Sequence, residues 1–319
     1  MLATLDEQSL AFRDDVLAGL SSAIPAVPAR WLYDHRGSEL FDAITRMPAY
    51  YPTRTEAALL HSIMPDVATR VPKGAAVVEF GAGSATKTPI LLDAVAPAAY
   101  VPVDISGEYL QTSAAELQQR LPWLRVIPVV ANFQQPFSPP SEIAGLPKLG
   151  FFPGSTIGNF VPGSAVALLR HFRALLGVGS RLLIGMDRVK PVERLIAAYD
   201  DPEGVTASFN LNLLERINRE LDGDIPINAF RHEARWNEML SRIEMHLVAT
   251  RDVDFTVSGQ RFAFNKGEDI HTENSHKYGQ RGARLLLLAG GWTTIAEWTD
   301  PSGDFAVILA EAEADRFAP

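Results

Sequence analysis

The fold is decided by the stretch Val77-Val78-Glu79-Phe80-Gly81-Ala82-Gly83-Ser84-Ala85-Thr86-Lys87. A short apolar run ends in an acidic residue, and two glycines one residue apart lead into a polar segment that can open a helix. This order is typical of the first strand of a doubly wound sheet and its nucleotide-binding loop. Gly81 and Gly83 allow close approach of a ligand because neither has a Cβ atom. Thr86 replaces the third glycine of dinucleotide-binding loops, and a plain glycine turn remains the alternative interpretation.

The composition is that of an ordinary globular protein. The chain has 319 residues, of which 47% are hydrophobic and 21% charged, enough for one large domain or two modest ones. A net charge of −9 without a dense Lys/Arg run argues against nucleic-acid binding. The absence of cysteine excludes a disulfide scaffold, thiolate chemistry and a cysteine-ligated zinc. Neither a signal peptide nor an apolar run of membrane-spanning length is evident, so we expect a cytoplasmic protein without a membrane partner.

Strand and helix patterns alternate between residues 75 and 189. We expect strands at 76–80, 99–103, 125–130, 149–153 and 181–186, with helices at 87–96, 106–120 and 163–176. Such alternation predicts a parallel sheet with helices on both faces. Two further strands near 293–298 and 305–311 would close this α/β, Rossmann-like sheet as a hairpin.

The alternation stops between residues 190 and 277. Helices are expected at 191–199 and 206–221, an alternating strand at 243–249, and a hairpin of 253–257 with 261–265. The sequence therefore predicts a second, α+β domain that recognises the substrate. We assign residues 1–54 and 190–277 to this domain, and residues 55–189 and 278–319 to the cofactor-binding domain.

Polar side chains follow three of the predicted strands, at the edge where ligands bind in open α/β sheets. Asp104 can accept both ribose hydroxyls of a nucleoside, or it can cap the next helix. Asn132 can accept a hydrogen bond from the exocyclic amine of adenine, while Phe133 packs on a face of the adenine ring. Ser155 and Thr156 lie in a polar loop after the fourth strand and are further candidates for cofactor binding.

Five motifs, in order along nearly the whole chain, resemble those of the histidine-specific S-adenosylmethionine-dependent methyltransferases. They are Tyr-Tyr-Pro-Thr-Arg-Thr-Glu at 50–56, Glu-Phe-Gly-Ala-Gly at 79–83, Gly-Ser-Thr-Ile-Gly-Asn at 154–159, Ala-Tyr-Asp-Asp at 198–201 and Thr-Glu-Asn-Ser at 272–275. The resemblance implies a class I methyltransferase fold, with S-adenosylmethionine as donor and S-adenosylhomocysteine as product. It further implies methylation of the α-amino group of L-histidine, up to the trimethyl product hercynine used for ergothioneine.

The resemblance also assigns roles to individual residues. Gly81 and Lys87 belong to the cofactor loop. At the position of Asn132, the family more often has aspartate. Asn159 and Tyr199 hold the substrate α-carboxylate, although periodicity alone favours Tyr199 as a core residue of its helix. Tyr51 lies beside the amino group and orients it, with help from Asn159, so these two are the candidate catalytic residues.

The remaining substrate contacts implied by the resemblance surround the imidazole ring. Glu273 and Ser275 read the ring, Met245 forms a wall of its pocket, and Tyr33 closes over the site. Neutral imidazole has one N–H donor and one lone-pair acceptor, which a carboxylate and a hydroxyl can match. Without the resemblance, residues 272–275 read equally well as a polar turn.

Several alternatives stay open. His271 and His276 invite a role as a base or ligand pair, but such residues more often serve the surface or support a site, and no metal is expected. The substrate could be another aromatic amino acid, such as a tryptophan derivative, whose indole would leave Ser275 unpaired. The chain could also be a non-catalytic S-adenosylmethionine-binding protein, which the presence of Tyr51, Asn159 and Tyr199 argues against. We expect a monomer that acts on a small molecule.

Overall fold

The computed structural model describes residues 7–83 and 87–314, and the chain divides into two compact units. The insertion unit comprises Met1–Tyr51 and Pro191–Ser275, and the sheet unit comprises Pro52–Lys190 and His276–Pro319. The chain thus passes between units after residues 51, 190 and 275, where the sequence predicted 54, 189 and 277. Thr86, at the place of the third glycine, lies outside the described residues.

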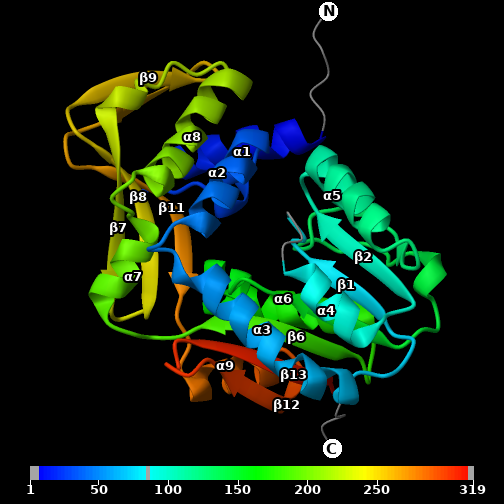
Figure 1. Cartoon of the computed structure of the whole chain (residues 1–319). Helices are drawn as coiled ribbons and strands as arrows, with labels where there is room; N and C mark the ends of the chain where they lie inside the picture. The colour runs from blue at the N-terminus through cyan, green and yellow to red at the C-terminus, as the bar shows by residue number, and fades with distance from the viewer. Residues whose placement is uncertain (1–6, 84–86, 315–319) are drawn as a thin grey trace, which may run out of the picture. The chain divides into compact units, whose positions relative to one another are not determined.

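Within its described residues, the sheet unit is built on an eight-stranded sheet of order β12-β13-β6-β5-β1-β2-β3, with β4 also paired to β2 (Figure 1). The strands are β1 (Ala76–Phe80), β2 (Ala99–Asp104), β3 (Arg125–Val126), β4 (Val129–Val130), β5 (Lys148–Phe152), β6 (Arg181–Asp187), β12 (Trp292–Thr299) and β13 (Phe305–Ala312). Strands β1 to β6 pair in parallel, whereas β13 is antiparallel to both β6 and β12. The predicted α/β, Rossmann-like sheet with a closing hairpin is confirmed.

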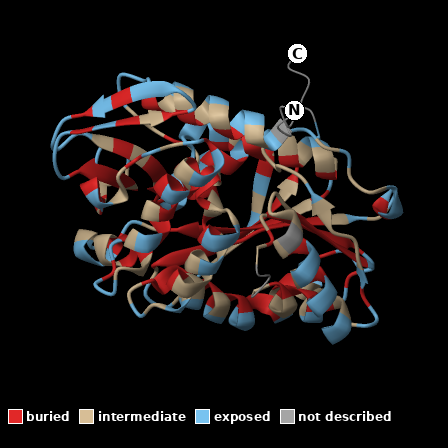
Figure 2. Ribbon diagram, turned by 90° about the horizontal axis from the view of Figure 1, so that it is seen from above, coloured by how far each residue is buried: buried red, intermediate tan, exposed pale blue. Residues whose placement is uncertain are grey.

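Helices cover both faces of this sheet because its strands are apolar on both sides. They are α3 (Tyr51–Arg70), α4 (Thr88–Val95), α5 (Gly107–Arg120), α6 (Pro162–Leu176) and α9 (Gln280–Ala289), with short 3-10 turns η2 (Ser141–Ile143) and η3 (Thr156–Asn159). Val77 belongs to a core formed with α3, α4 and α5, and its neighbour Val78 belongs to a core formed with α6 and α9. Much of the sheet is coloured as buried in Figure 2: β1, β2, β5, β6 and β13 are mostly buried, whereas β3, β4 and β12 are mostly intermediate or exposed.

The third predicted strand, 125–130, is not continuous. It is divided into β3 and β4, which both pair with β2. Pro128 lies between the two parts, and proline has no N–H to donate to a strand partner. The ladder is therefore interrupted at that residue, although the chain keeps its direction.

The insertion unit combines helices with two small antiparallel sheets (Figure 1). Its elements are α1 (Glu7–Leu20), η1 (Ala29–Leu32), α2 (His35–Arg46), α7 (Val192–Tyr199), α8 (Val205–Glu220), η4 (Ile227–Ala229), β7 (Phe230–Asn237), β8 (Arg242–Ala249), β9 (Val253–Val257), β10 (Gln260–Phe264) and β11 (Asp269–His276). One sheet has the order β11-β8-β7, and the other is the hairpin of β9 and β10. The expected α+β character is confirmed, but residues 272–275 form part of strand β11 and not a turn.

Candidate active site

The glycine loop after β1 is attached to the end of β2. Gly81 and Gly83 have φ values of +75° and +47°, a region that favours glycine. The Gly81 N–H donates to the Val103 carbonyl at 2.8 Å, and the Gly83 N–H donates to Asp104 Oδ2 at 3.1 Å. The strand order and these bonds together bring the loop and Asp104 to one place.

Asp104 organises two backbone segments with one carboxylate. Besides the bond to Gly83, its Oδ1 accepts a hydrogen bond from the Ser106 N–H at 2.9 Å. The N-cap of α5 is Ser106, so Asp104 does not cap that helix itself. Each carboxylate oxygen has a second acceptor site, which suits the hydroxyls of a ribose.

Phe133 lies directly against the glycine loop. A Cβ atom at Gly81 would be 3.3 Å from Phe133 Cε1, so a larger residue there would press on the ring. The ring meets Phe152 edge-on at 5.7 Å between centroids. The neighbouring Asn132 Oδ1 accepts from the Gln134 N–H at 3.0 Å, which fixes the amide orientation and leaves that oxygen one further lone pair. Both residues therefore have the chemistry expected of an adenine site.

Lys87 is held by a residue to which the sequence analysis gave no role. Its ammonium forms an ion pair with Glu56, a carboxylate only 1% exposed. Both oxygens of Glu56 also accept from the Gly154 N–H, at 3.0 and 2.8 Å. A Cβ at Gly185 would lie 2.0 Å from Glu56 Oε1, so this position in β6 needs glycine. Glu56 could have been found in the sequence as the acidic last residue of the motif at 50–56.

Glu79, the acidic residue before the glycines, is buried inside the sheet unit. Its Oε2 accepts hydrogen bonds from the Thr88 and Tyr100 hydroxyls, each at 2.7 Å. Burial raises the pKa of Glu79 to about 7, although the two hydroxyls lower it. Glu79 therefore joins β1 to the first residue of α4 and to β2, and it shapes the loop from within.

The loop after β5 uses its own hydroxyls. Ser155, with φ of +58°, accepts a hydrogen bond on Oγ from the Asp187 N–H at 2.9 Å, and Thr156 Oγ1 donates to the Pro153 carbonyl at 2.9 Å. These bonds shape the 3-10 turn η3, of which Asn159 is the last residue. Gly158 in that turn lies against the backbone of His276, because a Cβ there would be 2.8 Å from the His276 carbonyl oxygen.

In the insertion unit, strand β11 carries the two predicted imidazole readers. Glu273 and Ser275 are two residues apart and so lie on the same face of the strand, and both are buried. Ser275 Oγ is 2.7 Å from the Tyr199 hydroxyl. The Tyr33 hydroxyl is hydrogen-bonded to Glu273, and burial together with that carboxylate holds the pKa of Tyr33 well above its usual value. The fold thus brings together four of the predicted substrate residues.

The other predicted residues of the insertion unit are also buried. Tyr51 begins α3, and the Arg194 guanidinium lies 4.8 Å from the centre of its ring. Met245 lies on β8, the strand next to β11. Tyr50 packs edge-on against Tyr199 with ring centroids 6.0 Å apart, so both adjacent tyrosines are buried.

The two histidines of β11 do not form a pair. His271 and His276 are five residues apart and therefore lie on opposite faces of the strand. The ring of His271 faces His246 at 5.2 Å, and its Nε2 is 3.0 Å from the Glu273 carbonyl oxygen. Within residues 7–83 and 87–314, no group of three or more His, Asp or Glu side chains is arranged to hold a metal ion.

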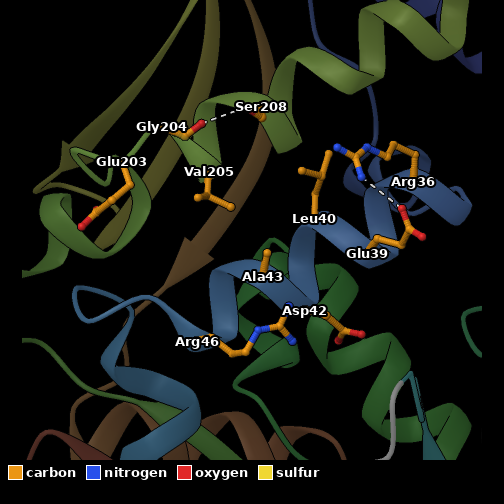
Figure 3. Close-up of a pocket in the computed structure, with 10 residues that line it drawn as sticks. All are labelled: Arg36, Glu39, Leu40, Asp42, Ala43, Arg46, Glu203, Gly204, Val205 and Ser208. Atoms are coloured by element: carbon orange, nitrogen blue, oxygen red, sulfur yellow. Dashed lines mark hydrogen bonds and ion pairs between the residues drawn. The ribbon is translucent and has the colours of Figure 1, made fainter.

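A groove of about 610 Å³ opens within the insertion unit between α2 and the start of α8 (Figure 3). Its lining mixes charges of both signs, with Arg36 and Glu39 joined at 3.1 Å and Arg46 and Glu203 on opposite walls. None of the predicted site residues lines this groove.

Comparison with known proteins identifies the family of the chain. The family model described as "Histidine-specific methyltransferase, SAM-dependent" matches residues 12–312. The chain is 40% identical over 317 residues to a histidine N-alpha-methyltransferase of Mycobacterium tuberculosis and 38% identical over 316 residues to that of Mycolicibacterium smegmatis, each alignment covering 96% of both chains. It is 28% identical over 285 residues to ergothioneine biosynthesis protein 1 of Neurospora crassa, covering 86% of this chain and 32% of that protein.

Among the residues that the structure describes, no helix combines the length and the apolar character needed to cross a membrane. The sheet unit places the Asp104 carboxylate beside the glycine loop, and the insertion unit places the Glu273 carboxylate and the Ser275 hydroxyl on one face of β11. This chain belongs to the family of histidine-specific, S-adenosylmethionine-dependent methyltransferases.

Proposed function

We propose that the chain methylates the α-amino group of L-histidine, up to trimethylhistidine (hercynine), and thereby supplies ergothioneine biosynthesis. The names of the relatives from Mycobacterium tuberculosis and Neurospora crassa support the amino acid and the pathway. The observation that carries the proposal is the pair Glu273 and Ser275 on one face of β11. A carboxylate there accepts the imidazole N–H, and a hydroxyl donates to the ring nitrogen that bears the lone pair.

Hydrogen-bonding partners already hold this pair in place. Tyr33 donates to Glu273, and the Tyr199 hydroxyl lies 2.7 Å from Ser275 Oγ. Because Tyr199 can accept from Ser275 or donate to it, the serine hydroxyl is able to turn toward a ligand. A site of such buried polar groups rejects an analogue that leaves one of them unpaired.

The residues of the sheet unit fit the donor. Asp104 would hold the ribose, Asn132 and Phe133 the adenine, and Gly81, Gly83 and Lys87 the amino-acid part of S-adenosylmethionine, since close backbone approach and a cation suit that group. When bound, S-adenosylmethionine would supply the methyl group: the amine nitrogen bonds to the methyl carbon in line, and the neutral thioether S-adenosylhomocysteine leaves. Ser155 and Thr156 would contribute through the shape of their loop, because both side chains are bonded within it.

The chain's own residues would act by positioning and by excluding water. Tyr199 and Asn159 keep the role of α-carboxylate ligands in this proposal, and Tyr51 orients the amine so that its lone pair points at the methyl carbon. The amine must be free of its proton to react. The buried rings of Tyr50, Tyr51 and Tyr199 provide a poorly hydrated surrounding that favours the neutral amine over ammonium.

Within this proposal the insertion unit recognises the amino acid and the sheet unit binds the donor. A monomer that acts in the cytoplasm, without nucleic acid or membrane as partner, stays a prediction from the sequence.

The test is a substrate panel. The purified protein is incubated with S-adenosylmethionine and each amino acid singly, and the products are weighed by mass spectrometry and located by NMR. We expect L-histidine alone to gain up to three methyl groups, all on the α-nitrogen. Methylation of tryptophan or of a tryptophan derivative in preference to histidine would overturn the proposal in favour of another aromatic substrate. No turnover with any amino acid would favour a binding protein.

A further inference from the structure

The last residue of α7 has a carbonyl group that is hydrogen-bonded to a buried histidine. The last carbonyl groups of a helix have no partner within it. Tyr199 is the last residue of α7, and its carbonyl oxygen lies 2.8 Å from Nε2 of His232 on β7. His232 is 8% exposed, so water cannot easily replace this bond.

The other nitrogen of His232 meets an amide. Its Nδ1 is 2.9 Å from Nδ2 of Asn210 on α8, and the same Asn210 nitrogen lies 3.2 Å from the His246 carbonyl oxygen. Only an NH₂ group suits a backbone carbonyl, so the amide orientation is set by His246. Nδ1 of His232 must then accept, and its proton must be on Nε2, which is what the Tyr199 carbonyl requires.

The chain of bonds continues into β11. The Thr272 hydroxyl donates to Asn210 Oδ1 at 2.7 Å. Asn210 is fully buried and Thr272 is 2% exposed. Thr272 directly precedes Glu273, and its side chain points to the opposite face of the strand. A continuous buried path therefore joins the backbone of Tyr199 to the strand that carries Glu273 and Ser275.

We propose that His232 and Asn210 are positioning residues for the amino-acid site, which they serve by fixing α7 relative to β11. The path holds the backbone carbonyl of Tyr199, while the hydroxyl of the same residue lies 2.7 Å from Ser275 Oγ. Neither residue touches the substrate in this account. The inference rests on the proposed function, because it names what holds the same site together.

The hydrogen bonds of His232 depend on its protonation state. Burial lowers the pKa of His232, although the carboxylates of Asp200, Asp201 and Glu233 raise it. The closest of these, Asp200 Oδ1, is 4.0 Å from Nε2. A proton on Nδ1 would place an N–H against the Asn210 NH₂ group and break the path, so the neutral ring is the competent form.

The positioning role of His232 and Asn210 is tested with two variants and an NMR spectrum. His232→Phe keeps a planar ring and removes both bonds, and exposed His35→Phe on α2 is the matched control. Asn210→Asp replaces the donor by an acceptor and should draw a second proton onto His232. Each protein is assayed for KM of L-histidine, kcat and the Kd of S-adenosylhomocysteine. The ¹⁵N NMR spectrum of the wild-type protein reports the tautomer of His232. Its His232 signals are identified by their loss in His232→Phe or by their shifts in Asn210→Asp.

We expect the spectrum to show a neutral ring protonated on Nε2 in the wild type and a cationic ring in Asn210→Asp. His232→Phe should raise the KM of histidine about tenfold, because a displaced Tyr199 loses about one hydrogen bond to the amino acid. Its kcat and its Kd for S-adenosylhomocysteine should stay within about twofold of the wild type, as should all values of the control.

A wild-type ring that is cationic or protonated on Nδ1, or an unchanged KM in His232→Phe, would overturn the inference. If His232→Phe does not fold, the ¹⁵N spectra of the wild type and of Asn210→Asp decide in its place. A wild-type protein that fails to methylate histidine would instead overturn the proposed function, and the tautomer would still be measured independently.

Discussion

Replacing Glu79 by glutamine should change how the stability of the protein depends on pH. In the folded protein, burial raises the pKa of Glu79 from 4.5 to about 7. Its two hydrogen bonds come from the hydroxyls of Thr88 and Tyr100, and the amide oxygen of glutamine can accept both. The substitution therefore removes the titration while keeping the contacts.

The magnitude follows from the linkage between protons and folding. Below pH 4.5 both the folded and the unfolded wild-type chains have Glu79 protonated, so its full contribution to stability is present. As the pH rises from 4.5 through 7, the unfolded chain loses this proton first and the folded state becomes less favourable. The rise of about 2.5 pKa units corresponds to about 3 kcal/mol at 1.36 kcal/mol per unit. We expect the free energy of unfolding of Glu79→Gln, relative to wild type, to increase by about this amount between pH 4.5 and pH 8.

The assay is urea unfolding of both proteins at several pH values, with Glu238→Gln as a control at an exposed glutamate. The control should follow the wild type at every pH. A difference between Glu79→Gln and wild type that stays constant within about 0.5 kcal/mol from pH 4.5 to 8 would refute the assignment of a buried carboxyl with a raised pKa.

Two further predictions concern the contacts of Glu56. Glu56→Gln should weaken binding of S-adenosylhomocysteine about tenfold by calorimetry, because Lys87 loses the charge that holds it; unchanged affinity would remove Glu56 from the cofactor site. Gly185→Ala should lower the free energy of unfolding by about 1–3 kcal/mol, because its Cβ would meet Glu56 Oε1 at 2.0 Å; urea unfolding that matches the wild type would show that the site can relax.

The sheet and the residues at the carboxyl ends of its strands could be predicted because both follow from local patterns. Apolar runs that alternate with helical stretches define a parallel sheet, and the residue after each strand then lies at the carboxyl edge. Asp104 and Phe133 were found in this way. Pro128 shows the limit of the pattern, since one missing N–H divides a strand whose hydrophobic run is continuous.

The supporting contacts could not be predicted, because they join residues far apart in sequence. Glu56 and Gly154 are 98 positions apart, and Asn210 and Thr272 are 62 apart. No local periodicity reports such a pair, and a buried His232 is indistinguishable in sequence from any histidine on a strand. Residues 272–275 were ambiguous for a related reason: their polar side chains match a turn as well as a strand until the pairing of β11 with β8 is known.

The central claim is that Glu273 and Ser275 read the imidazole ring. Calorimetric binding of L-histidine to the protein saturated with S-adenosylhomocysteine tests it most directly, in the wild type and in the variants Glu273→Gln and Ser275→Ala. Glu273→Gln keeps an acceptor oxygen but removes its charge, and a hydrogen bond to a charged group is about twice as strong as a neutral one, so this variant should weaken histidine binding about tenfold. Ser275→Ala removes a donor and should also weaken it about tenfold. Affinities for histidine within about twofold of wild type in both variants would contradict the account.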